Sequence, residues 1–129
     1  MATNVDIIRK LYETTKEGDI DYAKSVLHPE VVLYENESLP YRGVHRGLQG
    51  FLKVVEIAMG TWKDLQIEPK QFLDAGEYVI VMVRLIWTNQ KTGEPTETDL
   101  AEFWKFEDGK IIEILPFYWD TAAMLKPLA

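Results

Sequence analysis

The chain has 129 residues, of which 47% are hydrophobic and 27% charged, and these values fit one globular domain over residues 1–129. Acidic residues outnumber basic ones by 21 to 14, and the net charge of −7 argues against nucleic acid and anionic membranes as partners. The chain has no cysteine and only two histidines, so disulfides, thiol nucleophiles and metal sites are not expected.

The N-terminal half of the sequence is predicted to be mainly helical. Apolar residues three and four positions apart predict an amphipathic helix over residues 4–17, which Asn4 or Thr3 can cap. A shorter helix over 20–27 follows, with Asp19 as its cap. The remaining elements of this half are a β-branched strand over 31–35, a loop over 36–46 and a helix from about 47 to 60.

The C-terminal half is predicted to be mainly strands. Pro69 lies inside the first of them and indicates an edge strand or a bulge. Asp108-Gly109 is a strong hairpin signal between the last two. The strands are expected over residues 65–73, 78–88, 96–106 and 111–119, before a short helical turn within 120–125.

This grouping of elements predicts the α+β class, with helices on one face of an antiparallel sheet. Strands of about ten residues twist and curl. A curled sheet with helices across its open side forms a cone, so we expect an internal pocket.

Two segments of the sequence carry a family resemblance. They are residues 39–47 (LPYRGVHRG) and residues 103–111 (FWKFEDGKI), the second continuing to FYWDTA at 117–122. Together they resemble the SnoaL-like polyketide cyclases of the nuclear transport factor 2-like superfamily, which are also similar to ketosteroid isomerase. The resemblance implies a cystatin-like α+β roll with an internal pocket. Because the superfamily holds enzymes of several kinds and proteins without activity, it does not imply one reaction.

Glu35 is the first candidate catalytic residue. Period two puts Val31, Leu33 and Glu35 on one strand face, so the carboxyl group is expected at the rim of an apolar interior. Burial raises the pKa of a carboxyl group, which suits a general base. The resemblance implies that Glu35 occupies the position of the catalytic Asp of ketosteroid isomerase. The alternative is a solvated acid beside Glu37.

Glu102 is the second candidate. It alternates with Leu100, Trp104 and Phe106, which implies a buried acid in the middle of a strand. Kept protonated, it would donate a hydrogen bond to a substrate oxygen, the role that the resemblance to ketosteroid isomerase implies. The alternative is a structural ion pair with Arg84.

Three further positions bear on the site. Asp120 either adds an acid at the pocket mouth or caps the last helix. By the resemblance, Leu11 stands where ketosteroid isomerase has a tyrosine, and Tyr12 lies about 100° around the helix. We therefore expect no helix hydroxyl in the site and no steroid isomerisation. His28 and His45 are predicted to be structural.

Large aromatic and aliphatic side chains are expected to line the pocket, where flat walls with polar edges suit a ring-shaped ligand. The expected lining residues are Leu11, Tyr34, Tyr41, Phe51, Val55, Trp104, Tyr118 and Trp119. The outer sheet face is also expected to be apolar, and a homodimer is the simplest way to cover it.

The sequence thus predicts a cofactor-independent acid/base enzyme of the isomerase, cyclase or lyase type, acting on a small hydrophobic carbonyl compound. Glu35 would be its base and Glu102 its hydrogen-bond donor. The alternatives are a non-catalytic binding protein for a hydrophobic small molecule and a dimeric interaction domain. Because the N-terminal residues lack an uninterrupted apolar run, we expect a cytoplasmic location.

Overall fold

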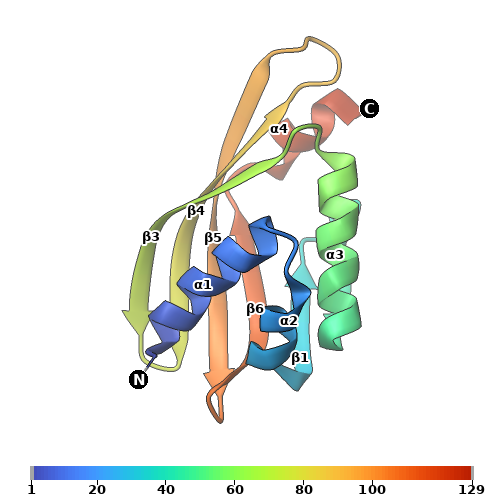
Figure 1. Cartoon of the computed structure of the whole chain (residues 1–129). Helices are drawn as coiled ribbons and strands as arrows, with labels where there is room; N and C mark the ends of the chain where they lie inside the picture. The colour runs from blue at the N-terminus through green and yellow to red at the C-terminus, as the bar shows by residue number, and fades with distance from the viewer. Residues whose placement is uncertain (1, 129) are drawn as a thin grey trace.

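The computed structural model describes residues 2–128 and confirms the α+β class (Figure 1). The helices are α1 (Asn4–Lys16), α2 (Ile20–Val26), α3 (Gly47–Thr61) and α4 (Thr121–Leu125), with a short 3₁₀ turn at Lys126–Leu128. The strands are β1 (Leu27–Glu35), β2 (Gly43–Arg46), β3 (Gln66–Ala75), β4 (Tyr78–Thr88), β5 (Pro95–Glu107) and β6 (Lys110–Tyr118). None of the helices within the described residues is long and apolar enough to cross a membrane.

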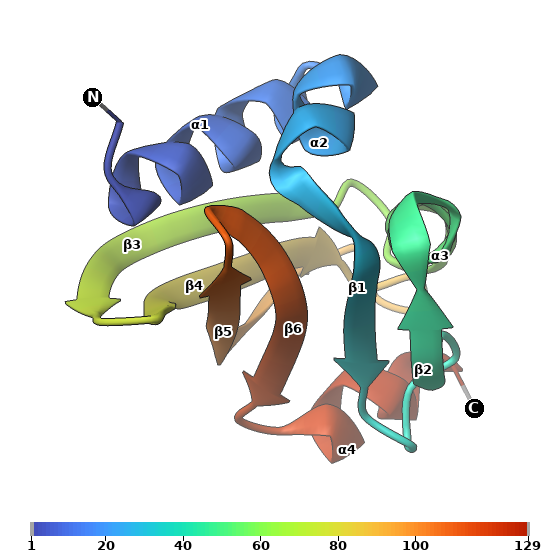
Figure 2. The ribbon, with the colours of Figure 1, turned by 90° about the horizontal axis from the view of Figure 1, so that it is seen from below.

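The six strands form one curved sheet in the order β2-β1-β6-β5-β4-β3. Neighbouring strands are antiparallel except for β1 and β6, which run parallel. The sheet curls so far that β3 and β4 at one end run across the direction of β1 and β2 at the other (Figure 2). This curl gives the sheet a concave face.

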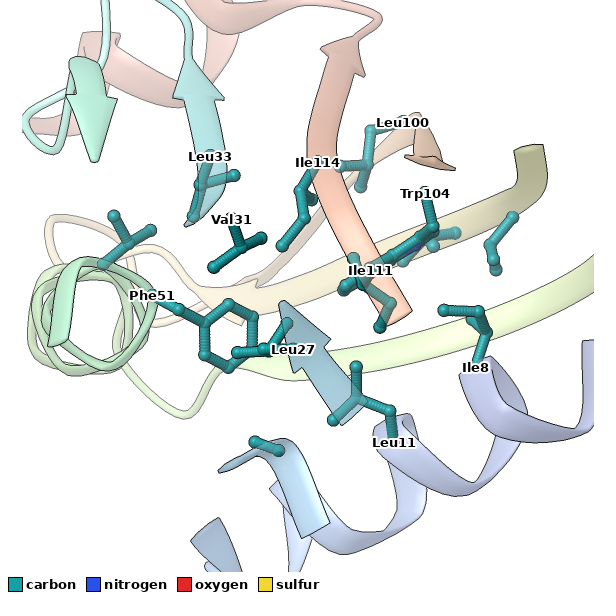
Figure 3. Packing of buried hydrophobic residues seen from close by; sticks show 14 of the residues in the cluster. Ile8, Leu11, Leu27, Val31, Leu33, Phe51, Leu100, Trp104, Ile111 and Ile114 are labelled. Carbon is teal, nitrogen blue, oxygen red and sulfur yellow. The ribbon is translucent and has the colours of Figure 1, made fainter. Parts of the chain in front are cut away.

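The long helices cover the concave face. Helix α1 packs across β3 and β4, α2 packs on α1, and α3 packs on β1 and β2. Ile8 and Leu11 from α1 and Phe51 from α3 point toward the sheet, where they meet inward side chains of β1 and β6 (Figure 3). The core thus lies between the helices and the sheet, as the alternation of buried and exposed strand residues requires.

The predicted helix starts are confirmed by their caps. The Thr3 hydroxyl accepts a hydrogen bond from the Asp6 amide, and the Asp6 carboxylate accepts one from the Thr3 amide, so the two residues form a capping box. Asp19 caps α2 by accepting from the Asp21 amide at 3.0 Å. Both caps satisfy amide groups that have no partner inside the helix.

Two differences from the sequence prediction arise from pairing between strands. Strand β1 begins at Leu27 rather than 31, because Leu27 pairs with Ile111 of β6. Strand β2 lies inside the predicted loop, where Val44 pairs with Tyr34. Contacts between distant segments therefore extend the sheet beyond what local composition indicates.

The structure confirms the predictions made from Pro69 and from the Asp108-Gly109 hairpin turn. Strand β3 is an edge strand, and its register shifts between Pro69 and Gln71, so the proline lies at both an edge and a bulge. Asp108 and Gly109 both have positive φ, 52° and 74°, as the tight hairpin between β5 and β6 requires.

Candidate functional site

A cavity of about 580 Å³ lies between the concave face of the sheet and helices α1 and α3. The walls near the sheet are apolar and include Leu33, Leu85, Leu100, Trp104 and Ile114. Several of these side chains point inward from their strands in Figure 3. Its volume is typical of small-molecule sites.

Glu35 lies at the end of β1 and lines this cavity together with Leu33. Its Oε1 atom is buried and has no hydrogen-bond partner among the described residues. Because burial removes water from the charged form, the pKa of Glu35 rises to about 8. Glu35 is therefore mostly neutral at pH 7, and it is not the solvated acid of the alternative hypothesis.

Glu102 lies in the middle of β5 and lines the same cavity as Leu100 and Trp104. The Tyr12 hydroxyl, from helix α1, donates a hydrogen bond to Glu102 Oε1. Burial raises the pKa of Glu102 to about 7. A group with this pKa changes charge near neutral pH.

The alternative ion pair between Glu102 and Arg84 is wrong. Arg84 pairs across the strands with Asp99, and its Nε lies 3.2 Å from Asp99 Oδ1. Glu102 pairs with Val81 instead, three residues away from Arg84 and on the opposite sheet face. The odd-numbered residues of β4 face the cavity side, and Arg84 faces outward.

The two acids flank strand β6. Glu102 pairs with Pro116 from one side. On the other side Leu33 pairs with Ile114 in parallel register, and continuing that register by two residues brings Glu35 level with Pro116. Two strand spacings separate the backbones of the acids by about 10 Å. Because the sheet is concave here, both side chains converge on the space above β6.

A second group of polar side chains lies at the Glu35 end of the cavity. Trp62 Nε1 donates a hydrogen bond to the Tyr41 hydroxyl at 3.0 Å. The hydroxyl oxygens of Tyr41 and Tyr118 are 3.3 Å apart. Burial raises the pKa of both tyrosines, and the charge of Glu35 raises them further, so both keep their hydroxyl protons.

Most of the predicted pocket residues line the cavity, and two do not. Those that do are Leu11, Tyr41, Phe51, Val55, Trp104 and Tyr118. Tyr34 is 39% exposed because it alternates with Leu33 and Glu35 and so faces away. Trp119 is 85% exposed because β6 ends at Tyr118, before it.

Asp120, predicted as a further catalytic acid, lies outside the cavity. Its Oδ1 accepts a hydrogen bond from the Ala123 amide at 3.0 Å, so Asp120 caps α4. The capping alternative is therefore confirmed, and Asp120 is not among the residues that line the cavity. Strand β6 ends two residues before Asp120, so the strand does not carry this carboxylate into the cavity.

Tyr12 lines the cavity although the sequence analysis did not place it in the site. Leu11 and Tyr12 both line the cavity, because α1 crosses a curved sheet and presents a wide face to it. The ring of Tyr12 also meets Trp104 edge to face, with centroids 5.9 Å apart. The expectation of a site without a helix hydroxyl is wrong. The available signal was the apolar stripe of the helix, which includes Tyr12.

The histidines and possible metal ligands lie outside the cavity. His45 Nε2 is 2.8 Å from the Tyr41 carbonyl oxygen, which gives this side chain a structural contact. His28, Glu107 and Asp108 place ligand atoms within 4.8 Å of one another at the surface. However, His28 Nδ1 already accepts from the Glu30 amide at 2.9 Å. None of these residues lines the cavity.

Comparisons with known proteins agree with this fold. The family model of the SnoaL-like domain matches residues 8–114. An NTF2-like protein from Burkholderia thailandensis is 24% identical, with a TM-score of 0.86 and coverage of 100% of this chain and 99% of that one. No protein among the curated sequences matches.

Two solved structures described as putative polyketide cyclases share the fold. IdmH from Streptomyces antibioticus is 22% identical, with a TM-score of 0.76 and coverage of 98% of this chain and 99% of that one. A SnoaL-like protein from Jannaschia is 16% identical, with a TM-score of 0.81 and coverage of 98% and 92%. At these identities the similarity establishes the fold.

Proposed function

The chain belongs to the SnoaL-like domain family, and we propose that it is a cofactor-independent acid/base enzyme acting on a small hydrophobic carbonyl compound. The observation that supports this proposal is the presence of two carboxyl groups, Glu35 and Glu102, in one apolar cavity. Neither forms an ion pair with a residue that the structure describes. A buried acid without a cationic partner destabilises the folded protein. Acids of this kind with shifted pKa values are concentrated at catalytic sites.

The two pKa values suit transfer of a proton near neutral pH. With values of about 8 for Glu35 and about 7 for Glu102, the pair holds roughly one proton between pH 7 and 8. One carboxyl group is then a base and the other an acid. General acid–base catalysis is most efficient when the pKa of the catalytic group lies near the working pH.

The proposed reaction begins at a carbon next to a carbonyl group. The ionised carboxylate removes a proton from this carbon, and the electrons of the C–H bond form a C=C bond. The carbonyl oxygen takes up the displaced electron pair and is stabilised by a hydrogen bond or proton from the neutral carboxyl group. Return of the proton to another carbon gives isomerisation. Attack of the enolate carbon on a second carbonyl gives cyclisation, and expulsion of a leaving group gives a lyase reaction.

Hydrogen exchange tests the proposal without knowledge of the natural substrate. The probe is 1-tetralone in D₂O, and ¹H NMR follows loss of the protons next to its carbonyl group. The unaltered protein should accelerate this exchange. Glu35→Gln and Glu102→Gln should each lower the rate by about 10²- to 10⁴-fold, the usual contribution of a general acid or base.

Glu37→Gln is the matched control, since Glu37 is exposed in the loop after β1. Its exchange rate should equal that of the unaltered protein. Unchanged exchange in both cavity variants would contradict the proposal. Binding of tetralone without any exchange would instead assign the cavity to a non-catalytic binding protein.

A further inference from the structure

The cluster of Tyr118, Tyr41 and Trp62 holds one hydrogen-bond donor more than it uses. Trp62 contributes one N–H group and the tyrosines one O–H group each. Two of these three hydrogens serve contacts inside the cluster, from Trp62 to Tyr41 at 3.0 Å and between the two hydroxyls at 3.3 Å. One hydroxyl hydrogen therefore remains for a group outside the cluster.

Polarisation along the chain of hydrogen bonds favours Tyr118 as the residue that keeps this hydrogen. Indole N–H is a donor only, so the Tyr41 oxygen must accept from Trp62. A hydroxyl that accepts a hydrogen bond becomes a better donor, because successive hydrogen bonds polarise one another. The 3.3 Å contact between the two hydroxyls fits either donor. This polarisation favours Tyr41 as the donor, which leaves the Tyr118 hydrogen for a group in the cavity that Tyr118 lines.

Glu35 lies at the same end of the cavity, with its buried Oε1 unpartnered among the described residues. Its charge raises the pKa of both Tyr41 and Tyr118, so the three groups are close enough to interact. No hydrogen bond joins Glu35 to either hydroxyl in the part of the chain that the structure describes. An oxygen atom of a ligand placed between Tyr118 and neutral Glu35 would satisfy both.

Glu102, on the other side of β6, has different surroundings. Tyr12 donates its only hydroxyl hydrogen to Glu102 Oε1, and it therefore has no hydrogen to donate to a ligand. A hydrogen bond donated to a carboxyl group favours its charged form. The Tyr118 hydrogen thus lies beside Glu35, and Glu102 is an acceptor stabilised by a donor. Among the described residues, the cavity also holds the buried Trp104 Nε1 donor, two residues after Glu102 on β5, without a partner.

On the premise of the proposed function, we propose that Tyr118 is a further catalytic residue whose hydroxyl, positioned by Tyr41 and Trp62, binds the substrate carbonyl oxygen beside Glu35. Glu102 then removes the proton from carbon. The C–H electrons form the C=C bond of an enol, and Glu35 transfers its proton to the oxygen that Tyr118 holds. These roles are the reverse of those expected from the sequence, where Glu35 was the base.

Binding of two probes tests this assignment independently of turnover. Tetralin and 1-tetralone differ only in a carbonyl oxygen, and quenching of Trp62 and Trp104 fluorescence measures the affinity of each, since both rings line the cavity. The unaltered protein should prefer the ketone. Tyr118→Phe should reduce that preference about three- to tenfold, the usual worth of one neutral hydrogen bond, with tetralin affinity unchanged.

Tyr34→Phe is the matched control, because Tyr34 is 39% exposed and faces away from the cavity. It should bind both probes as the unaltered protein does. A ketone preference that survives in Tyr118→Phe, or is absent from the unaltered protein, overturns the proposal. Loss of the preference in Tyr12→Phe instead would place the oxygen at Glu102 and also overturn it.

The carbonyl stretching frequency of bound 1-tetralone, measured by infrared difference spectroscopy, tests the positioning role of Tyr41. Tyr41→Phe and Tyr118→Phe should both raise the frequency, because a weaker hydrogen bond leaves a stronger C=O bond. A purely structural tyrosine would leave the frequency unchanged. If no hydrogen exchange occurs but the preference for the ketone depends on Tyr118, the proposed enzymatic activity fails while the proposed binding role of Tyr118 stands. Failure of the activity and failure of the Tyr118 assignment are therefore distinguishable.

Discussion

Glu35 and Glu102 each hold a carboxyl group in an apolar cavity, and this position couples the stability of the protein to pH. The pKa of Glu35 rises from 4.5 to about 8 on folding, and that of Glu102 from 4.5 to about 7. Below pH 4.5 both the folded and the unfolded chain hold the proton. Between pH 4.5 and 8 the unfolded chain releases protons that the folded chain keeps, so stability contributed by these groups is lost as pH rises.

Glu35→Gln should therefore stabilise the protein in alkaline solution. The variant removes the cost of ionising a buried acid, so its free energy of unfolding at pH 8.5 should exceed that of the unaltered protein by on the order of 5 kcal/mol. At pH 4.5 the two should be nearly equal, since the acid is then neutral. Urea unfolding at both pH values checks this. A stabilisation independent of pH would show that charge burial is not its cause.

The rate of hydrogen exchange into 1-tetralone should follow a bell-shaped pH curve. One carboxyl group must be ionised and the other neutral, so the rate should fall below about pH 7 and above about pH 8, where the pair is fully protonated or fully ionised. The two limbs belong to the pair rather than to one residue. A rate that rises steadily through pH 9 would contradict the need for a neutral acid.

At the scale of elements, helix α3 forms one wall of the cavity and is held by close contact with β2. A Cβ atom at Gly50 would lie 2.8 Å from the His45 backbone carbonyl carbon, so only glycine permits this approach. Phe51 and Val54, which follow in the same helix, line the cavity. The position of α3 on the sheet therefore influences the shape of the site.

Gly50→Ala should destabilise the protein by about 1–3 kcal/mol, because the methyl group meets backbone and the helix must shift. Gly60 is the matched control in the same helix, because a methyl group there would have no neighbouring atom within 4 Å. Gly60→Ala should stabilise by up to about 1 kcal/mol through helix propensity. Urea unfolding of both variants measures the contrast, and equal effects would contradict the steric explanation.

At the scale of the whole molecule, the outer face of the sheet carries apolar side chains that none of the helices within residues 2–128 covers. Phe117 is 57% exposed and Met82 39%. Phe117 meets Phe103 edge to face, with centroids 5.3 Å apart, and Phe103 meets Tyr78 at 6.3 Å. We propose that a second copy of the chain covers this surface, as the sequence led us to expect.

The charged residues on this outer face are compatible with contact between two copies of the chain related by a two-fold axis. Arg84 pairs with Asp99 at 3.2 Å, and Lys105 with Glu113 at 3.6 Å, so both signs are present. A two-fold axis brings each patch against its own copy, and opposite charges that are already paired within each patch limit repulsion between like charges across the contact.

Phe117→Glu should prevent formation of the proposed dimer, because a charge in the middle of the contact would lose its water without gaining a partner. Sedimentation velocity measures the change. Ile20→Glu is the control, since Ile20 is 53% exposed on α2, on the helical side of the sheet. A monomer in the unaltered protein, or a dimer in Phe117→Glu, would contradict the proposed interface.

Local patterns in the sequence determined the class of fold, most elements and the inward direction of both acids. Helix spacing and caps predicted α1 and α2, and the hairpin signal at Asp108-Gly109 predicted the turn before β6. Period two along β1 and β5 predicted that Glu35 and Glu102 share faces with large apolar residues. These features depend only on residues near one another in the chain.

Only the tertiary structure decided how those elements meet. The register of β4 on β5 pairs Arg84 with Asp99 rather than Glu102, and the path of α1 across the curved sheet brings Tyr12 to Glu102. The end of β6 at Tyr118 leaves Asp120 outside the cavity. Strand register and helix crossing depend on packing between distant segments, which periodicity within a single element does not encode.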